Sequence, residues 1–340
     1  MKDLPKRPWL APWYQLLDKD EKVLLKSGDV IIEIEGKSMH NLLRRILPLL
    51  DGLRKREDIY NAFKVEEREI VDRLLTTLVK ENIVIDKEDE NKEMVISNTQ
   101  YDVLNFFRAT ECRYENKVVE VHTIAKLLNE TKVGIIGDSF IADEIARMLK
   151  LSLVKRVEKV KWPIVEDKVK DIELFVLVPR LQELHILEEW NDYALSNSKQ
   201  WIQVLPHDGD CAIVGPFCLP HETMCYECFK IRIISNVEYK EELSSWYEGI
   251  KNKKVKARPY PIPVQFDFLV SSIASLHILG SILKNEYKLF DCFYTIELVL
   301  HESEFKFDLK KNYIYRVPRC PKCSGTAEQP SLLVWSDEVR

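Results

Sequence analysis

The sequence carries "MCYECFKIR" at residues 224–232 and "PRCPKCSGT" at residues 318–326, and each stretch contains a Cys-x-x-Cys pair. A two-residue gap lets two thiolates point at one tetrahedral metal ion, and two such pairs supply a complete set of four ligands. We therefore predict one structural zinc ion per chain. Two unrelated knuckles, or disulfides in an oxidising compartment, are the alternatives. The expected ligands are Cys225, Cys228, Cys320 and Cys323.

The composition is that of a chain with a sizeable core and a mildly acidic surface. Its 340 residues are 46% hydrophobic, which fits two or three domains, and the net charge of −5 argues against a main role on nucleic acid. The N-terminus has no signal-peptide core, and we count no run of about 18 apolar residues, so we expect no membrane contact and a cytoplasmic location. The remaining cysteines are expected to be buried free thiols: Cys112, Cys211, Cys218 and Cys292.

The N-terminal segment begins with a predicted hairpin. "KVLLKSGDVIIEIEG" at residues 22–36 indicates two strands on either side of a turn at Gly28. Ser38 is expected to cap a following helix, and Pro48 must bend or shorten that helix. A second, short helix is expected at "REDIYNAF".

A third helix is predicted from Glu66 to Asn82, because its apolar residues recur with a 3.6-residue period. "IVID" at residues 83–86 then predicts a short strand. Two strands, three helices and a strand give residues 1–86 the outline of a winged-helix-like domain. Residues 87–130 are expected to form a charged linker and a helical connector.

Residues 131–340 alternate between apolar strands and amphipathic helices, which is typical of a doubly wound α/β domain. The run "IELFVLVP" at residues 172–179 is continuously apolar, as expected of a parallel strand buried on both faces. Further strands are expected at residues 117–124, 132–138 and 200–208, and helices at residues 139–150 and 184–199.

The first loop of this domain lacks the glycines that bind a nucleotide. Such loops usually read Gly-x-Gly-x-x-Gly, so that the backbone can approach the phosphates at a helix N-terminus. Here the sequence from Gly137 to Ala142 is "GDSFIA". Asp138 would add a negative charge, and Phe140 would place a ring where a phosphate should sit. We therefore expect a tight strand-to-helix turn that binds no ATP.

The order of these features resembles the ubiquitin-activating-type, or ThiF-like, adenylating enzymes. The resemblance lies in "GPFCLPHETMCYECFKIR" at residues 215–232 and "VPRCPKC" at residues 317–323, after a doubly wound domain. With the altered loop, the chain is most similar to a degenerate branch of that family. This branch comprises the leader-peptide-binding partner proteins of thiazole/oxazole-modified peptide biosynthesis, also called cyclodehydratase C-type or ocin-ThiF-like proteins.

The resemblance covers nearly the whole chain and implies a non-catalytic accessory protein. Such proteins bind the leader of a ribosomally made precursor peptide. They deliver it to a separate YcaO-family cyclodehydratase, which uses ATP to form azolines. The fold class implied is α/β: a winged-helix-like peptide-recognition domain, then a Rossmann-like ThiF-type domain with a four-cysteine structural zinc site and no ATP.

The resemblance also implies where the leader binds. In the family it adds as a strand to a sheet edge and presses apolar side chains against a helix. Val30–Glu35 is the candidate edge strand, and the helix Glu66–Asn82 is the candidate wall. For each side chain the alternative is a core position or a solvated helix charge. The candidate residues are Val30, Ile31, Ile32, Ile34, Arg68, Arg73 and Leu74.

Two other classes of function stay open at this stage. One is a working ThiF-type adenylating enzyme that consumes ATP. The other is a winged-helix DNA-binding regulator, which the five acidic and three basic residues of Glu66–Asn82 disfavour, because phosphate binding needs a basic face. We expect a precursor peptide and a YcaO enzyme as partners, with no nucleic acid and no membrane. A homodimer is an open alternative.

Overall fold

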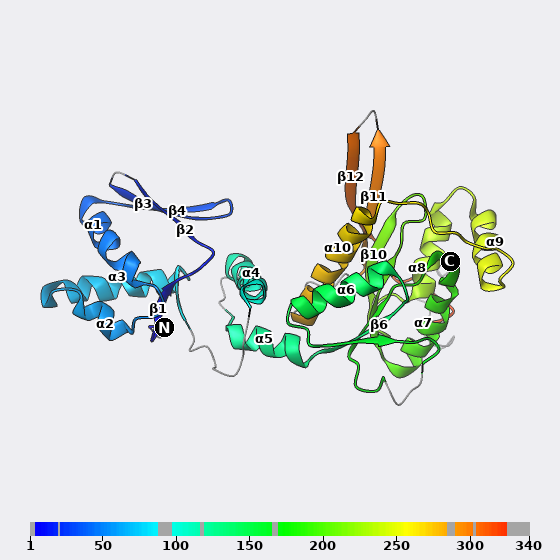
Figure 1. The fold of residues 1–340 in the computed structure, drawn as a ribbon, viewed down its shortest axis with the longest axis horizontal. Helices are drawn as coiled ribbons and strands as arrows, with labels where there is room; N and C mark the ends of the chain where they lie inside the picture. Colours follow the sequence, from blue (N-terminus) through cyan, green and yellow to red (C-terminus); the bar gives the residue numbers. More distant parts are fainter. Residues whose placement is uncertain are drawn as a thin grey trace, which may run out of the picture. The chain divides into compact units, whose positions relative to one another are not determined.

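The computed structural model describes residues 4–19, 21–87, 97–115, 119–164, 169–283, 290–301 and 304–324. The chain divides into two compact units, residues 1–126 and residues 127–340 (Figure 1). The predicted boundaries at residues 86 and 130 stay predictions. Each unit has its own core and is described separately.

The N-terminal unit contains a three-stranded antiparallel sheet in the order β2-β3-β4. β2 spans Gln15–Lys19, β3 Lys22–Ser27 and β4 Val30–Glu35. The predicted hairpin is confirmed, with Ser27 opposite Val30 across the two-residue turn. Gly28 begins that turn at φ 64°, a conformation that favours glycine in such hairpins.

A second, two-stranded antiparallel sheet joins β1, Pro8–Leu10, to β5, Val84–Asp86. β5 is the strand predicted at residues 83–86. β1 and β2 were not predicted, because one has only three residues and the other is exposed along its whole length. Neither therefore shows the alternation of apolar and polar residues that marks a half-buried strand.

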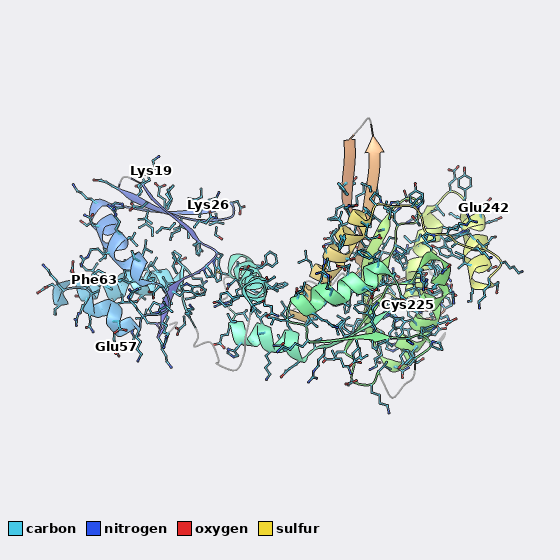
Figure 2. The ribbon with its side chains drawn as sticks, viewed as in Figure 1. Lys19, Lys26, Glu57, Phe63, Cys225 and Glu242 are labelled. Carbon is cyan, nitrogen blue, oxygen red and sulfur yellow. The ribbon has the colours of Figure 1, made fainter. Side chains whose placement is uncertain are left out.

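Three helices of this unit pack their apolar sides into one core. They are α1 at Lys37–Ile46, α2 at Arg56–Asn61 and α3 at Arg68–Lys80. Leu43, Ile46 and Leu75 are buried there with Phe63, whose place among the helices is labelled in Figure 2. The Arg45 guanidinium lies 4.6 Å from the centre of the Phe63 ring.

Some helix boundaries differ from the sequence prediction. Ser38 does not cap α1, because Gly36 precedes the first turn with φ 114°. Pro48 does shorten the helix, which ends in a 3₁₀ turn at Leu47–Leu49. The helix predicted from Glu66 begins with another 3₁₀ turn, and α3 itself starts at Arg68.

The strand predicted at residues 117–124 is wrong. After α4, Asn98–Glu115, the chain forms a further helix, α5, at Val121–Glu130. The β-branched residues suggested a strand. However, Ile124, Ala125 and Leu128 are buried, and their spacing is that of one helix face.

The second unit is built on a seven-stranded mixed sheet in the order β12-β11-β10-β9-β8-β6-β7. β7, β6, β8 and β9 are parallel, as the α/β pattern predicts, and β10, β11 and β12 add antiparallel strands. The bounds are β6 Lys132–Ile136, β7 Arg156–Val160, β8 Leu174–Leu177, β9 Gln200–Leu205, β10 Ala212–Cys218, β11 Cys292–His301 and β12 Glu304–Tyr313.

Helices cover both faces of this sheet (Figure 1). On one face α6, Phe140–Leu151, packs along α10, Val264–Leu283, and the Ser275 hydroxyl lies 3.7 Å from the Met148 sulfur. On the other face lie α7 at His185–Asn197, α8 at Tyr226–Asn236 and α9 at Lys240–Lys251. The fold is therefore a two-sided α/β arrangement.

α10 corrects the expectation that no apolar stretch is long enough to span a membrane. By length and composition it passes that test, with a mean hydropathy of 1.7. Half of the 18-residue stretch of α10 that meets these criteria is buried inside the structure, where α10 packs against α6. A core helix of a folded domain passes the same test, so the finding is weak evidence for a membrane span.

Candidate metal centre and peptide-binding edge

The four predicted metal ligands meet in one buried cluster, which we call the cysteine cluster. Cys225 immediately precedes α8, and Cys228 lies in its first turn; Cys320 and Cys323 follow β12. All four Sγ atoms lie within 4.8 Å of one another. The Sγ atom of Cys225 is 3.9 Å from that of Cys228 and 3.7 Å from that of Cys320, and Cys228 is 3.5 Å from Cys323.

These separations fit a tetrahedral zinc ion. With Zn–S bonds of about 2.3 Å, the sulfur atoms of a ZnS₄ tetrahedron lie about 3.8 Å apart. A disulfide would need about 2.05 Å. The N-terminus of α8 also favours negative charge on the first pair of thiolates. The grouping of the four cysteines is thus confirmed, and the zinc ion itself stays a prediction.

Backbone and side-chain donors support the cysteine cluster. The Val317 N–H donates to the Cys228 sulfur at 3.4 Å, which disperses thiolate charge. The Arg316 guanidinium donates to the carbonyl of Cys323, and the Cys320 N–H donates to the carbonyl of Val317 at 3.1 Å. The second knuckle is therefore ordered by its own turn and by Arg316.

Because the four thiols lie so close together, the pKa values of two of them shift in opposite directions. The pKa of Cys323 is lowered to about 3, chiefly by a hydrogen bond with Cys225 and next by one with Cys228. The pKa of Cys225 is raised, first by its hydrogen bond to Cys228. A bound zinc ion would replace the shared protons, because a coordinating thiol is deprotonated.

Cys218 lies near the cysteine cluster but does not belong to it. Its side chain is buried at the end of β10, and burial raises its pKa, as do the nearby Cys228 and Cys323. The neutral thiol is a poor metal ligand. Among the described residues the candidate metal group contains four cysteines and no fifth ligand.

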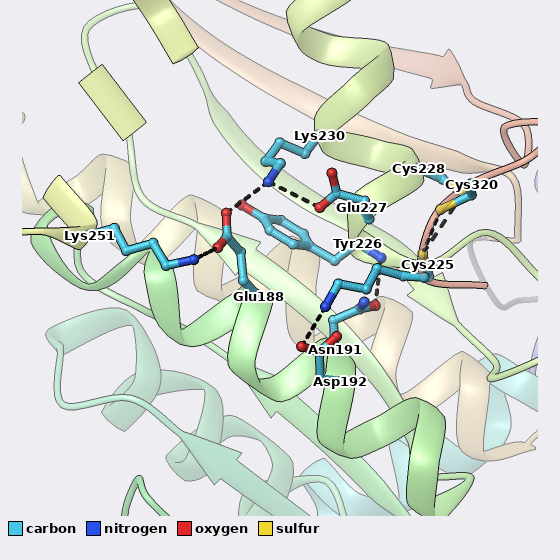
Figure 3. Close-up of polar contacts among 11 residues, drawn as sticks. Glu188, Asn191, Asp192, Cys225, Tyr226, Glu227, Cys228, Lys230, Lys251 and Cys320 are labelled. Atoms are coloured by element: carbon cyan, nitrogen blue, oxygen red, sulfur yellow. Dashed lines mark hydrogen bonds and ion pairs between the residues drawn. The ribbon is translucent and has the colours of Figure 1, made fainter. Parts of the chain in front are cut away.

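An ion-pair network holds α7, α8 and α9 together beside the cysteine cluster (Figure 3). Glu188 of α7 accepts from Lys230 at 2.8 Å and from Lys251 at 2.7 Å, and Lys230 also meets Glu227 at 3.0 Å. Burial raises the pKa of Glu188, but the two lysines outweigh it, so the net shift is downward.

Two further contacts join α7 to both knuckles. The Asn191 side-chain oxygen accepts from the Tyr226 N–H at 2.9 Å, directly after the first ligand. Asp192 accepts from Lys322, between the last two ligands, at 2.7 Å (Figure 3). The sequence analysis missed these residues, because no local pattern links them to the cysteines.

Elemental analysis of the purified protein should give about one zinc per chain. Cys323→Ser should lose most of this zinc and lower the melting temperature, because metal binding and folding are coupled. Cys211→Ser, at a half-buried cysteine outside the cysteine cluster, is the matched control and should keep the metal. The zinc assignment would be contradicted if the parent protein contained no zinc, or if Cys323→Ser lost its zinc and still melted at the temperature of the parent.

Glu188→Gln should lower the free energy of unfolding at pH 7 by about 1 kcal/mol, the upper end for solvent-accessible ion pairs, since Glu188 is 24% exposed and Lys251 53% exposed. The pKa of Glu188 lies below its ordinary 4.5 in the folded state. Its contribution is therefore present above about pH 4.5 and is lost as the pH falls through the folded pKa. Urea melts of both proteins from pH 7 to pH 3 measure the difference.

Both proteins lose cysteine thiolates alike on acidification, so the comparison isolates Glu188. Glu248→Gln, on the exposed side of α9, is the matched control and should change stability little at any pH. A deficit that persisted undiminished at pH 3 would show that Glu188 acts by packing and not by charge.

The altered glycine loop is a tight turn whose polar groups contact one another. Gly137 has φ 148°, and a Cβ there would lie 2.3 Å from the Val178 carbonyl oxygen, so this glycine is required by the close strands. The Ser139 hydroxyl accepts from the Ala142 N–H at 3.3 Å and caps α6. Asp138 pairs with Arg180 at 3.2 Å.

Phe140 forms an edge-to-face pair with Phe268 of α10, with ring centres 5.0 Å apart. Its ring thus stands at the first turn of α6, where phosphate-binding folds keep the backbone open. A cleft of about 510 Å³ adjoins the loop at the carboxyl ends of the parallel strands. Lys159 lines it, and its ammonium group is held by the Gly137 carbonyl and Asp143.

The candidate peptide-binding residues of β4 lie on an edge strand. Among the described residues β4 pairs with β3 alone. Val30 and Ile31 are 43% and 60% exposed, whereas Ile32 and Ile34 pack against the core of the unit. The strand can therefore offer its outer edge and its exposed apolar residues to a partner.

The register between β3 and β4 shows which backbone N–H groups of β4 point away from β3 and can pair with a further strand. Pairs alternate along an antiparallel ladder, and the pair that closes a two-residue turn, Ser27 and Val30, is hydrogen-bonded. Ile32 therefore directs its N–H at β3. Ile31 and Glu33 direct theirs outward, away from the sheet.

The candidate residues on α3 differ from one another in their surroundings. Leu74 is buried in the core, and Arg73 pairs with Glu69 one turn away on the same helix. Arg68 donates to the Asn61 side chain at 3.2 Å. Ile70, which the sequence analysis did not single out, is exposed on this helix.

No model of a protein family matches the sequence, and no curated protein sequence matches it. Solved structures share the fold. The heterocyclase TruD superposes with a TM-score of 0.66 at 18% identity, over 94% of this chain and 43% of that chain. Escherichia coli MccB superposes with a TM-score of 0.59 at 12% identity, over 95% and 98% of the two chains.

A third structure, the microcin C7 biosynthetic enzyme MccB in complex with N-formylated MccA, gives a TM-score of 0.60 at 14% identity. It covers 93% of this chain and 99% of its own. At such identities the likeness shows the fold. The likeness to MccB thus covers almost the full length of both chains, whereas this chain spans less than half of TruD.

Proposed function

We propose that this protein is a non-catalytic accessory protein that binds the leader of a ribosomally made precursor peptide. It delivers that peptide to a separate YcaO-family cyclodehydratase for azoline formation. The observation that carries the proposal is the free outer edge of β4, in a unit distinct from the α/β sheet. Such an edge pairs readily with an extended peptide.

The structures that share the fold support the peptide class of substrate. One is named as a heterocyclase in complex with substrate and cofactor, and others hold MccB with MccA. In the proposal, residues 1–86 act as the winged-helix-like recognition domain and the zinc-tied domain meets the enzyme. Holding the leader near the enzyme makes delivery of the core peptide nearly intramolecular.

The altered loop supports a role without catalysis. Asp138 and Phe140 occupy the positions where a phosphate would need open backbone N–H groups. In the proposal the protein works in the cytoplasm with one structural zinc and no ATP. Its partners are the precursor peptide, the YcaO enzyme and, as an open alternative, a second copy of the chain.

A working adenylating enzyme is the second candidate. It is favoured by the full-length likeness to MccB, one structure of which holds AMPCPP and MccA. Nucleotide binding and peptide binding separate the two candidates. A DNA-binding regulator is the weakest candidate, because α3 carries acidic residues among its exposed positions, Glu69 and Asp72.

Calorimetry with ATP and magnesium should show no heat of binding to this protein. The physical reason is the loss of the backbone concavity that glycines provide for phosphate. Escherichia coli MccB, solved with AMPCPP, is the positive control under the same conditions. Saturable binding in the micromolar range would replace the scaffold proposal with the enzyme.

Ile31→Pro should weaken leader binding, because it removes an outward N–H from the free edge of β4 without breaking the ladder to β3. Loss of one backbone hydrogen bond should raise the Kd about fivefold to tenfold. The measurement is fluorescence polarisation with a labelled leader peptide of the proposed precursor.

Ile31→Ala is the matched control, since it trims the same exposed side chain and keeps the N–H. It should bind more tightly than Ile31→Pro, and the zinc content of both should equal that of the parent. Equal leader affinity for the proline variant and the parent would exclude strand addition at β4.

A further inference from the structure

A groove of about 660 Å³ lies on the face of the sheet that carries α7, α8 and α9. Its floor is built from Leu205 of β9, Ile213 of β10 and Phe293 of β11, with Ile314 just after β12. Leu205 and Ile213 stand directly opposite each other in the ladder. On β11 the residue opposite Ile213 is Thr295, so the floor is an apolar surface interrupted by Thr295 and Asn312, which hydrogen-bond each other at 3.1 Å.

The walls of the groove are two helix faces with helical spacing. α8 contributes Phe229 and Ile233, four residues apart, and α9 contributes Leu243, Trp246 and Tyr247. The Trp246 and Tyr247 rings meet edge-to-face with centres 5.3 Å apart. Ile233, Trp246 and Tyr247 are only partly buried, so both helices keep apolar surface turned to the groove.

Two apolar helix faces and a largely apolar floor around one groove form a surface on which a helix or strand of another protein can pack. Its volume falls in the range of binding sites, with room for several large side chains. We propose that the groove binds the apolar face of an amphipathic, basic segment of a partner protein.

The charge around the groove selects a basic partner. Its charged lining residues are Asp208, Asp210 and Arg232, and both acids are exposed. Asp208 is held in place by the N–H groups of Asp210 and Cys211. The short connection after α8 and the first turn of α9 together carry three exposed acids against one base, Lys240. These acids are Glu238, Glu241 and Glu242, the last labelled on α9 in Figure 2.

Such a surplus of negative charge beside an apolar groove favours lysine- or arginine-flanked apolar anchors and disfavours acidic ones. No residue of β4 and no lining residue of the cleft at Gly137 lines the groove. The inference therefore goes beyond leader binding and stands whether or not that proposal holds.

The test uses the full-length zinc-loaded protein and a synthetic, fluorescein-labelled probe. The probe is a twelve-residue peptide with leucines at a helical i, i+3, i+4, i+7 spacing and lysines elsewhere. A second peptide replaces every lysine by glutamate. Fluorescence polarisation should show saturable binding of the lysine peptide and at least tenfold weaker binding of the glutamate peptide.

Two variants locate the site. Ile233→Glu places a charge in the groove wall, and Asp210→Lys reverses an exposed charge at its rim. Each should weaken the lysine peptide at least fivefold. Glu173→Lys, an exposed acid outside the groove lining, makes the same charge change and should leave binding at the parent level apart from long-range screening.

Zinc content and melting temperature confirm that each variant is folded. If Ile233→Glu fails to fold, Asp210→Lys against Glu173→Lys decides the question alone. The inference is overturned if the lysine peptide does not saturate, if the glutamate peptide binds equally well, or if Asp210→Lys and Glu173→Lys weaken binding alike. Photo-crosslinks from a benzoylphenylalanine in the probe should map to α8 and α9, and crosslinks elsewhere would also overturn it.

Discussion

The cysteine cluster is the constraint on which the second unit depends. It joins the start of α8 to the turn after β12, and so closes a segment that contains α9, α10, β11 and β12. A zinc ion held by the cluster would close this long segment and so remove much freedom from the unfolded chain. Among the described strands β12 pairs with β11 alone and is therefore an edge strand. The cluster lies just after β12 and gives this edge strand a second attachment to the unit.

The effect of the cluster extends beyond its four sulfur atoms. Asn191 and Asp192 of α7 contact the first and second knuckles, and Glu188, one turn earlier, gathers the lysines of α8 and α9. α7 packs on the parallel strands through Trp190, which is fully buried against Phe175. The cysteine cluster is thereby tied to the core of the sheet, and the same contacts hold α8 and α9, which form the walls of the groove.

Sequence alone could predict the features that have a local signature. Paired cysteines, a glycine that starts a two-residue hairpin, and the apolar run of β8 each follow from a few neighbouring residues. Residues 117–124 misled the prediction, because β-branched residues favour a strand while Ile124 and Leu128 bury one helix face. Burial, which is a tertiary property, decides between the two. The contacts of Asn191 and Lys322 were equally out of reach, since their partners are 35 and 130 residues away.

The altered loop departs from the glycine pattern at two side chains, Asp138 and Phe140, and magnitudes distinguish their contributions. The Asp138–Arg180 pair is largely exposed, 93% for the acid, and such pairs contribute about 0–1 kcal/mol. The ring of Phe140 lies at the first turn of α6 and packs edge-to-face on Phe268 of α10. The two side chains that depart from the glycine pattern are thus held differently, Asp138 weakly at the surface and Phe140 by packing against another helix. Together with the Ser139 cap on α6, these contacts give the loop partners within the chain, so its conformation is supported without a bound ligand.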